Sequence, residues 1–155
     1  MVDGPADAHA KLNVNTLSEE DLTQLDAMDE TLAQSVIAWV QGESASTTTT
    51  AIGADAGAYL SLRYPYKPRE APMRSVRELE LVAGVQSPAV RGEDWNLNGV
   101  LDPNENDGES SFPPDNADGK LDAGWSAYLT ASSELGGMAA SGLKRLDVKT
   151  ASASD

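Results

Sequence analysis

The residues best suited to chemistry lie between positions 94 and 105, in the stretch DWNLNGVLDPNE. Side chains with oxygen atoms recur there at short intervals around a central Gly99. A calcium loop of the EF-hand type takes its ligands from its first, third, fifth, seventh, ninth and twelfth positions and has a glycine at the sixth. The matching ligands are Asp94, Asn96, Asn98, the main-chain carbonyl of Val100, Asp102 and Glu105.

This spacing has a physical cause. Alternate side chains of a tightly coiled loop converge on one point, Gly99 permits the sharp bend, and Glu105 offers two oxygens at once. Many flexible oxygen ligands suit calcium better than magnesium, and the stretch holds no His or Cys for zinc. We therefore predict a calcium site, with Leu101 turned into the core. The alternative is a solvated acidic turn.

A second stretch, PDNADGKLDAGW at 114–125, repeats the pattern incompletely. Pro114 and Trp125 occupy its first and twelfth positions, and neither side chain offers an oxygen. A complete shell requires Asp115 to swing in, or another acid such as Asp107 to reach across. We predict one calcium ion in the first stretch and keep a second ion here as a hypothesis, against a rigid acidic turn. Its candidate ligands are Asp115, Asn116, Asp118, the carbonyl of Lys120 and Asp122.

The flanks of these stretches bear on the role of the metal. Pro88 and Gly92 precede the first and GESSFPP follows it, so neither is expected between long helices. This argues against a calcium sensor that swings its helices on binding. A structural role fits better, in which calcium neutralises crowded carboxylates and holds a polar segment in place.

Composition excludes several classes of function. The chain of 155 residues has a formal net charge of −14, which would repel a phosphate backbone, so we expect no nucleic-acid partner. It has no cysteine, its one histidine is His9, and no serine lies in a nucleophile elbow, so we expect no enzyme. The apolar runs are too short for a membrane helix, and the length suits one core.

Two helices are expected before the acidic stretches. A capping box of Thr16 and Glu19 predicts a helix over 17–26, and Asp29 is suited to cap a second helix that ends near Gly42. Each helix has one apolar face, so together they form a hairpin that the rest of the chain must cover. The stripe of the second helix consists of Leu32, Val36, Ile37 and Val40, with Trp39 on its flank.

The next part of the chain is expected to be less regular. Residues 44–57 predict a long loop, and the proline-broken stretch 59–73 predicts an extended connector anchored by its tyrosines. Ser75 should cap a third helix that stops at Gly84. The stretch WSAYLTASS, at 125–133, favours a strand.

The predicted fold class is mainly α, with an irregular calcium-loop region and at most a short β element. RLDVKT at 145–150 repeats the pattern of KLNVNT at 11–16, which indicates the start of a second similar unit. The predicted organisation is a flexible lead at 1–10, a helical domain at 11–90, an acidic calcium-binding region at 91–125, and a strand or linker leading into the second unit at 126–155.

Several motifs in order support a family resemblance. They are LNVNT, a helical hairpin ending at a Trp, a connector with YLSL, PY and AP, and a helix of the form S-x-x-EL-x-x-V-x-G that begins at Ser75 and ends at Gly84. In this order and spacing, residues 11–86 resemble the periplasmic helical region of the type II secretion minor pseudopilin K family.

The resemblance implies a SAM-like domain of the helix-hairpin-helix kind, inserted into a pilin-type α/β fold, so the sequence would be a fragment of an α+β pseudopilin. It implies a periplasmic protein that helps assemble and cap the pseudopilus with the I and J pseudopilins. The N-terminal helix that anchors pseudopilins in the inner membrane is missing from this sequence. Family members are similar in carrying calcium near this region, which implies ligand roles for Asp94, Asn96, Asn98, Asp102 and Glu105.

Two other functions stay open. A dockerin-type adhesion module also binds its partner through calcium loops, but it needs two complete loops that are each followed by a helix. A helix-hairpin-helix nucleic-acid-binding protein would use the hairpin at 22–39, yet the turn DAMDE offers carboxylates where phosphate needs amides. Binding to a cohesin-like domain would support the first function, and a gel shift at low salt would support the second.

Overall fold

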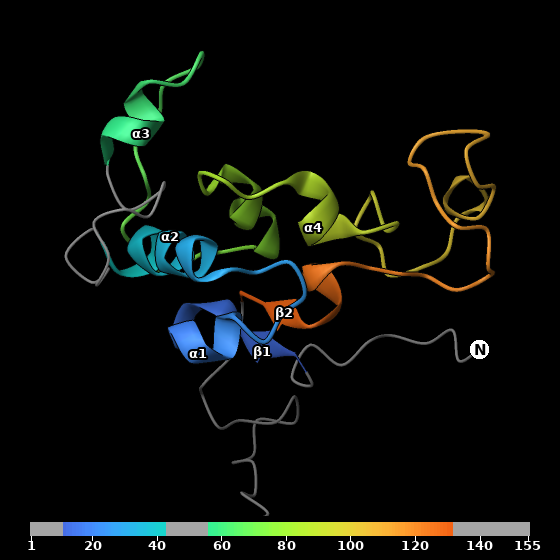
Figure 1. The fold of residues 1–155 in the computed structure, drawn as a ribbon, viewed down its shortest axis with the longest axis horizontal. Coiled ribbons are helices and arrows are strands. Elements are labelled where there is room, and N and C mark those ends of the chain that lie inside the picture. Colours follow the sequence, from blue (N-terminus) through green and yellow to red (C-terminus); the bar gives the residue numbers. More distant parts are fainter. Residues whose placement is uncertain (1–10, 43–55, 132–155) are drawn as a thin grey trace, which may run out of the picture.

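The computed structural model of the chain describes residues 11–42 and 56–131. Its two strands pair in parallel, with Leu12 opposite Leu129, so the two ends of this region lie side by side (Figure 1). The prediction of a mainly helical chain with a short β element is confirmed. In chain order the elements are β1 (Leu12–Asn13), η2 (Val14–Thr16), α1 (Glu19–Leu22), α2 (Glu30–Gln41), α3 (Ala56–Leu60), η4 (Val76–Leu81), α4 (Ser87–Arg91), η5 (Pro103–Glu105), η6 (Trp125–Ala127) and β2 (Leu129–Thr130).

The helix α1 is a single turn that Ser18 caps. The Ser18 hydroxyl accepts a hydrogen bond from the Asp21 amide at 3.2 Å, and Asp21 Oδ2 accepts one from the Ser18 amide at 3.0 Å. Donation from Ser18 holds the pKa of Asp21 below its ordinary value. The predicted helix over 17–26 is wrong in its length and in its cap at Thr16, because Thr16 already belongs to the 3-10 turn η2.

The helix α2 forms as predicted between Asp29 and Gly42. Asp29 Oδ1 accepts a hydrogen bond from the Leu32 amide at 2.8 Å, and Gly42 ends the helix with a φ of +93°. The apolar stripe faces the core, where Val36 and Val40 are buried. The turn α1 packs against α2, so the two elements form the expected hairpin.

Three aromatic rings join α2 to the connector that follows it. The ring of Tyr59 lies 5.5 Å from that of Trp39 and 5.4 Å from that of Tyr66, between centroids. Tyr59 is buried, so its segment coils into α3 to reach the core, and the prediction of an extended chain from residue 59 is wrong at its start. Tyr64 is not a packing anchor of the core, because 76% of it is exposed and its ring lies against the Arg63 guanidinium. The predicted loop at 44–57 lies outside the described residues up to position 55.

The element η4 begins at its predicted cap but differs in type and length. Ser75 Oγ accepts a hydrogen bond from the Arg77 amide at 3.3 Å. The element is a 3-10 helix that ends at Leu81, not at Gly84, because Val82 turns to an extended conformation and is buried.

The helix α4 follows η4 and was not predicted. Pro88 lies in its first turn, where a missing amide hydrogen costs nothing. Arg91 at the end of α4 pairs with Glu80, and Arg91 Nη2 donates to Glu80 Oε2 at 2.7 Å. Donation from Arg91 lowers the pKa of Glu80. This ion pair fixes the end from which the acidic segment departs.

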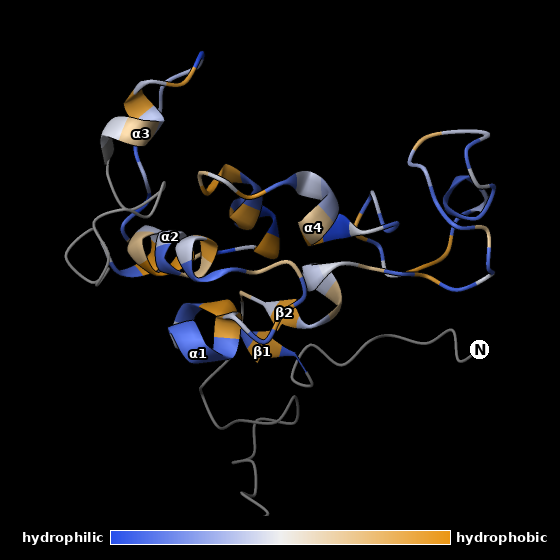
Figure 2. Cartoon of the chain, in the orientation of Figure 1, coloured by the Kyte–Doolittle hydropathy of each residue, from blue (hydrophilic) through white to orange (hydrophobic). Residues whose placement is uncertain are grey.

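One core unites these elements. The apolar colours of Figure 2 gather where the helices and strands meet, whereas the segment beyond α4 is mostly hydrophilic. Leu101 is half-buried and does not belong to the core cluster, so the prediction that it points into the core is wrong. The largest buried apolar side chains are Leu22, Trp39, Tyr59, Leu79, Trp125 and Leu129.

The described region ends with η6 and β2. The predicted strand at 125–133 is therefore wrong at its start, because Trp125 begins a 3-10 turn that lets its ring enter the core. The repeat at 145–150 lies outside the described residues. Within residues 11–42 and 56–131, no helix has the length and apolar character needed to cross a membrane.

Candidate metal centre

The acidic residues occupy two successive loops. The segment that carries them leaves α4 and extends away from α2 and α3, in yellow to orange in Figure 1. Apart from the 3-10 turn η5 it contains no helix or strand before η6. Residues 94–105 are called the first loop and residues 114–125 the second loop.

The first loop coils around the carboxylate of Asp94. This side chain is only 3% exposed, and its two oxygens accept hydrogen bonds from the amides of Asn98 and Gly99 at 2.9 and 2.8 Å. The bend needs positive φ angles, which are +59° at Leu97 and +73° at Gly99. Glycine adopts such an angle without strain, which explains its place at the sixth position.

Side chains at the third, fifth and ninth positions of the first loop meet. Asn96 Oδ1 accepts a hydrogen bond from the Asn98 amide at 2.9 Å, and Asn98 Oδ1 accepts one from the Val100 amide at 2.6 Å. Both asparagine side-chain amides donate to Asp102 Oδ2, at 2.7 and 3.0 Å. The polar atoms of three predicted ligands therefore lie within one small volume.

Glu105 closes the first loop from its twelfth position. Its Oε1 accepts a hydrogen bond from the Trp95 amide at 2.9 Å, and its Oε2 accepts one from the Asp102 amide at 3.2 Å. The residue is 1% exposed, an unusual burial for a carboxylate. One side chain thus joins the beginning of the loop to its end.

The aromatic ring of Trp95 ties the first loop to α4. It lies against the Arg91 guanidinium, whose carbon is 5.0 Å from the ring centroid, and meets the Phe112 ring edge-on at 4.6 Å between centroids. Arg91 also donates to the Trp95 carbonyl. The same arginine that pairs with η4 therefore positions the loop.

The middle of the second loop repeats the contacts of the first. Asn116 Oδ1 accepts a hydrogen bond from the Asp118 amide, and Asp118 Oδ1 accepts one from the Lys120 amide, both at 2.8 Å. The Asn116 side-chain amide donates to Asp122 Oδ2 at 3.1 Å. The third, fifth and ninth positions are thus arranged in both loops by the same kinds of contact.

Two residues outside the second loop make the contacts that its first and twelfth positions lack. Asn106 Oδ1 accepts a hydrogen bond from the Gly119 amide at 2.9 Å, as Asp94 does from Gly99. Glu93 accepts the amides of Asn116 and Asp122 at 3.0 and 3.1 Å, much as Glu105 does in the first loop. Sequence reasoning missed both residues. The sequence does contain a sign of their role, because both lie next to the first loop: Glu93 directly precedes it and Asn106 directly follows it.

Asp115, or alternatively Asp107, was predicted to complete the second loop. Both carboxylates accept hydrogen bonds from groups in and beside the link between the two loops. Asp115 accepts hydrogen bonds from the amides of Asp107, Gly108 and Ala117, at 3.1, 2.9 and 2.7 Å. Desolvation alone would raise the pKa of Asp115, but the hydrogen bonds from the three amides outweigh it, so the pKa lies below its ordinary value. The Asp107 carboxylate accepts the amide and the hydroxyl of Ser111.

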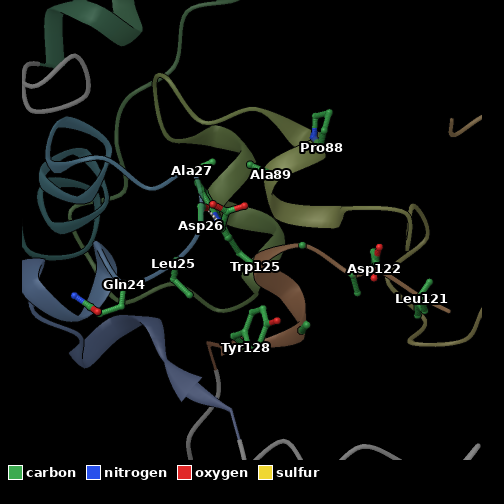
Figure 3. Close-up of a pocket in the computed structure, with 13 residues that line it drawn as sticks. Gln24, Leu25, Asp26, Ala27, Pro88, Ala89, Leu121, Asp122, Trp125 and Tyr128 are labelled. Atoms are coloured by element: carbon green, nitrogen blue, oxygen red, sulfur yellow. Dashed lines mark hydrogen bonds between the residues drawn. The ribbon is translucent and has the colours of Figure 1, made fainter. Parts of the chain in front are cut away.

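Trp125, at the twelfth position of the second loop, is an anchor. Its side chain lies beside Asp26 (Figure 3), and its indole nitrogen donates to the Asp26 carbonyl at 2.7 Å. Only 3% of the residue is exposed. It lines a cavity of about 620 Å³ together with Leu25, Pro88 and Tyr128. The end of the second loop is thereby fixed to the turn between α1 and α2.

Two glycines let the base of the loops lie directly on α4. A Cβ atom on Gly92 would collide with the Asp122 carbonyl, and one on Gly124 would collide with the Ala89 carbonyl. The Glu93 amide donates to the Asp122 carbonyl at 2.9 Å in the same place. The main chain directly before the first loop is therefore in contact with the main chain at the end of the second loop.

The donors gathered in both loops are hard oxygen atoms. In the part of the chain that the structure describes, no three Asp, Glu, His or Cys side chains cluster closely enough to hold a metal by themselves. Any cation here would depend on asparagine oxygens and main-chain carbonyls as well as carboxylates, a mixture that suits calcium.

Comparison with known proteins gives one match. Residues 10–92, more than half of the chain, match the family described as type II secretion system (T2SS), protein K. No curated protein and no solved structure matches the chain. The matched stretch contains the helical elements up to α4 and ends at Gly92, before the two loops.

Proposed function

The chain belongs to the type II secretion system protein K family, and we propose that it serves that system as a calcium-stabilised protein that helps assemble and cap the pseudopilus. Membership itself gives the role in type II secretion and interaction with other components of the pseudopilus. The resemblance of residues 11–86 to the K family is thereby confirmed. Calcium and the capping role are the proposal.

The first loop supports the proposal of calcium through its donor set. Asp94 and Glu105 are almost fully buried, and buried carboxylates are costly without a compensating positive charge. Main-chain amides meet part of this cost, and a divalent cation would meet more of it. The proposed ligands are Asp94, Asn96, Asn98, the Val100 carbonyl, Asp102 and Glu105.

The second loop supports a second calcium site once residues from outside it are included. Its middle positions are supplied by Asn116, Asp118, the Lys120 carbonyl and Asp122. The contacts that Asp94 and Glu105 make in the first loop are made here by Asn106 and Glu93. We place Asn106 and Glu93 in this shell in preference to Asp115, whose oxygens already accept the main-chain amides of Asp107, Gly108 and Ala117.

The surroundings of the loops favour assembly over the alternative of a dockerin module. A dockerin needs a helix after each loop, whereas the first loop ends within the three residues of η5, and η6 after the second is equally short. We propose a non-catalytic protein whose partners are the I and J pseudopilins. Its proposed location is the periplasm, with an inner-membrane anchor in the full-length protein.

Calcium titration tests the metal part of the proposal. We expect saturable heat in calorimetry and a melting temperature that rises with calcium and falls with chelator, because an ion that binds the folded state stabilises it. Asp94→Asn should weaken both effects, whereas Glu20→Gln, an equal charge change at an exposed position of α1, should leave them intact. Protein that shows neither heat nor a chelator effect would contradict the calcium proposal.

Secretion in cells tests the assembly part. A strain that lacks the gene for this protein should lose type II secretion, and the wild-type gene should restore it. Co-purification of the full-length protein with the I and J pseudopilins is the expected physical counterpart. Restored secretion without any such association would contradict the capping role while leaving the family assignment in place.

A further inference from the structure

A second pocket, of about 330 Å³, has a charge opposite to that of the chain. Lys11, Arg74 and Arg77 line it, and among the described residues no Asp or Glu does. The formal net charge of the chain is −14, so a purely cationic pocket is unexpected. The salt bridges within residues 11–42 and 56–131 use Arg69 and Arg91, so no described carboxylate forms a close ion pair with Lys11, Arg74 or Arg77. At longer range, the charge of Arg77 helps to lower the pKa of Glu80, after the larger effect of Arg91.

The structure holds two of these cations in place without using up their donors. Lys11 Nζ donates to the Ser126 carbonyl at 2.6 Å, and Arg77 Nη2 donates to the Asn96 carbonyl at 2.7 Å. A lysine carries three N–H donors and an arginine five, so both retain donors for a ligand. The third cation, Arg74, is exposed. The pocket therefore presents positive charge that is already positioned.

Apolar side chains line the same pocket. Val76 and Leu97 are half-buried there, and Leu129 lies beside them. A small inorganic anion would contact the cations but leave these apolar walls in water. A peptide that carries both carboxylates and aliphatic side chains would use the charged and the apolar parts together.

We propose that this pocket binds an acidic peptide segment of a partner protein, with carboxylates against Lys11, Arg74 and Arg77 and an aliphatic side chain against Val76 and Leu97. Acids more than about 10 Å from the pocket are largely screened at 0.1 M salt. The carboxylate of Glu78 lies nearer, because it accepts the Arg74 amide at 2.8 Å, but it is already paired with Arg69. Binding should weaken as salt is raised.

The first loop forms one wall of this pocket. Leu97 belongs to the loop, and Arg77 is held by the carbonyl of Asn96, a proposed ligand residue. Ordering of the loop by calcium would therefore fix part of the peptide site. The inference names the chemistry of a partner and so rests on the proposed assembly role, but the two can fail separately.

A titration with capped peptides tests the pocket directly on the whole chain with calcium present. The probe is a heptapeptide in which leucines alternate with pairs of glutamates, and the reference probes are its glutamine counterpart and inorganic phosphate. We expect saturable binding of the acidic peptide alone. Arg74→Glu should weaken it about tenfold or more, because like charges then face each other. Lys67→Glu, an equal charge change on an exposed residue outside the pocket, should not.

Three results would overturn the inference: equal binding of the glutamine peptide, displacement of the peptide by equimolar phosphate, or full binding by Arg74→Glu. Circular dichroism checks that Arg74→Glu folds. Lys11→Gln serves as the second variant, and its affinity for the acidic peptide should fall about threefold. Stabilisation by calcium without peptide binding would reject the peptide site and retain the calcium sites. Peptide binding without stabilisation by calcium would reject the calcium sites and retain the peptide site.

Discussion

Glu93 and Glu105 make parallel contacts in successive loops, each spreading its two carboxylate oxygens over two main-chain amides. Glu105 does so within its own loop, whereas Glu93 precedes the first loop and serves the second. Asn106, directly after Glu105, also serves the second loop. Both ends of the first loop thus carry residues that the second loop needs, so the loops should form together.

Glu93→Gln tests this dependence. The variant removes the charge that the second loop takes from outside, so we expect its calcium affinity to fall about tenfold or more while the first loop retains its own ligands. Calorimetric titration measures both sites. Glu109→Gln is the matched control, because Glu109 is an exposed acid of the same segment. Unchanged affinities in Glu93→Gln would show that Glu93 has no part in the second site.

Glu105→Ala should abolish calcium binding in the first loop and also destabilise the calcium-free protein. Removal of the carboxylate leaves the amides of Trp95 and Asp102 without their acceptor, at a cost of about 3 kcal/mol in the free energy of unfolding. Urea unfolding with chelator present measures the second effect. Glu105→Gln keeps one acceptor oxygen and should lose less than half as much. A stable Glu105→Ala variant would mean that the loop re-forms without it.

The ion pair of Glu80 and Arg91 predicts a pH dependence. The pKa of Glu80 lies below its ordinary value of 4.5 because Arg91 donates to its carboxylate. The pair therefore contributes stability above about pH 4.5, and this contribution is lost as the pH falls through the lowered pKa. The free energy of unfolding of the wild type should exceed that of Glu80→Gln by about 1 kcal/mol at neutral pH, and the two should be equal at about pH 2. Urea unfolding of both proteins measures this difference. A difference in the free energy of unfolding that does not change with pH would contradict the prediction.

Gly92→Ala should unfold the base of the loops. Gly92 has a φ of +57°, and a Cβ there would meet the Asp122 carbonyl and the Gly124 amide, which are main-chain atoms and cannot turn aside. We expect a loss of about 3 kcal/mol or more in the free energy of unfolding. Gly119→Ala has a similar φ of +78° but open space around it, so it should lose only about 1 kcal/mol in calcium-free buffer. Equal losses would mean that φ alone sets the cost.

Local patterns predicted local structure well in this chain. The helix α2 formed where the stripe of Val36 and Val40 and the cap of Asp29 indicated, because one period and one side chain suffice to specify it. The cap of α1 was mistaken because Thr16 and Ser18 both suit that position. Ser18 is the cap because Asn15, beside Thr16, is held by hydrogen bonds of its side chain to the main chain of Met73 and Ala131. Both partners lie far along the chain, so the local pattern does not indicate them.

The second loop shows the limit of such reasoning. A search within the loop finds no residue for its first and twelfth positions, because Asn106 and Glu93 come from before it. Glu93 and Asn116 are 23 positions apart, a contact that only the fold of the intervening chain decides. Periodicity likewise gave no sign of α3, which forms because Tyr59 reaches the rings of Trp39 and Tyr66.

The pairing of β1 with β2 has a mechanical consequence. The strands are parallel, so chain that precedes Leu12 and chain that follows Thr130 leave from opposite ends of the pair. Tension between those two flanks would load the ladder bonds together in shear rather than peel them open singly. The pull would pass through this short pair of strands and bypass the two loops, so a filament under strain would leave the geometry of the loops undistorted.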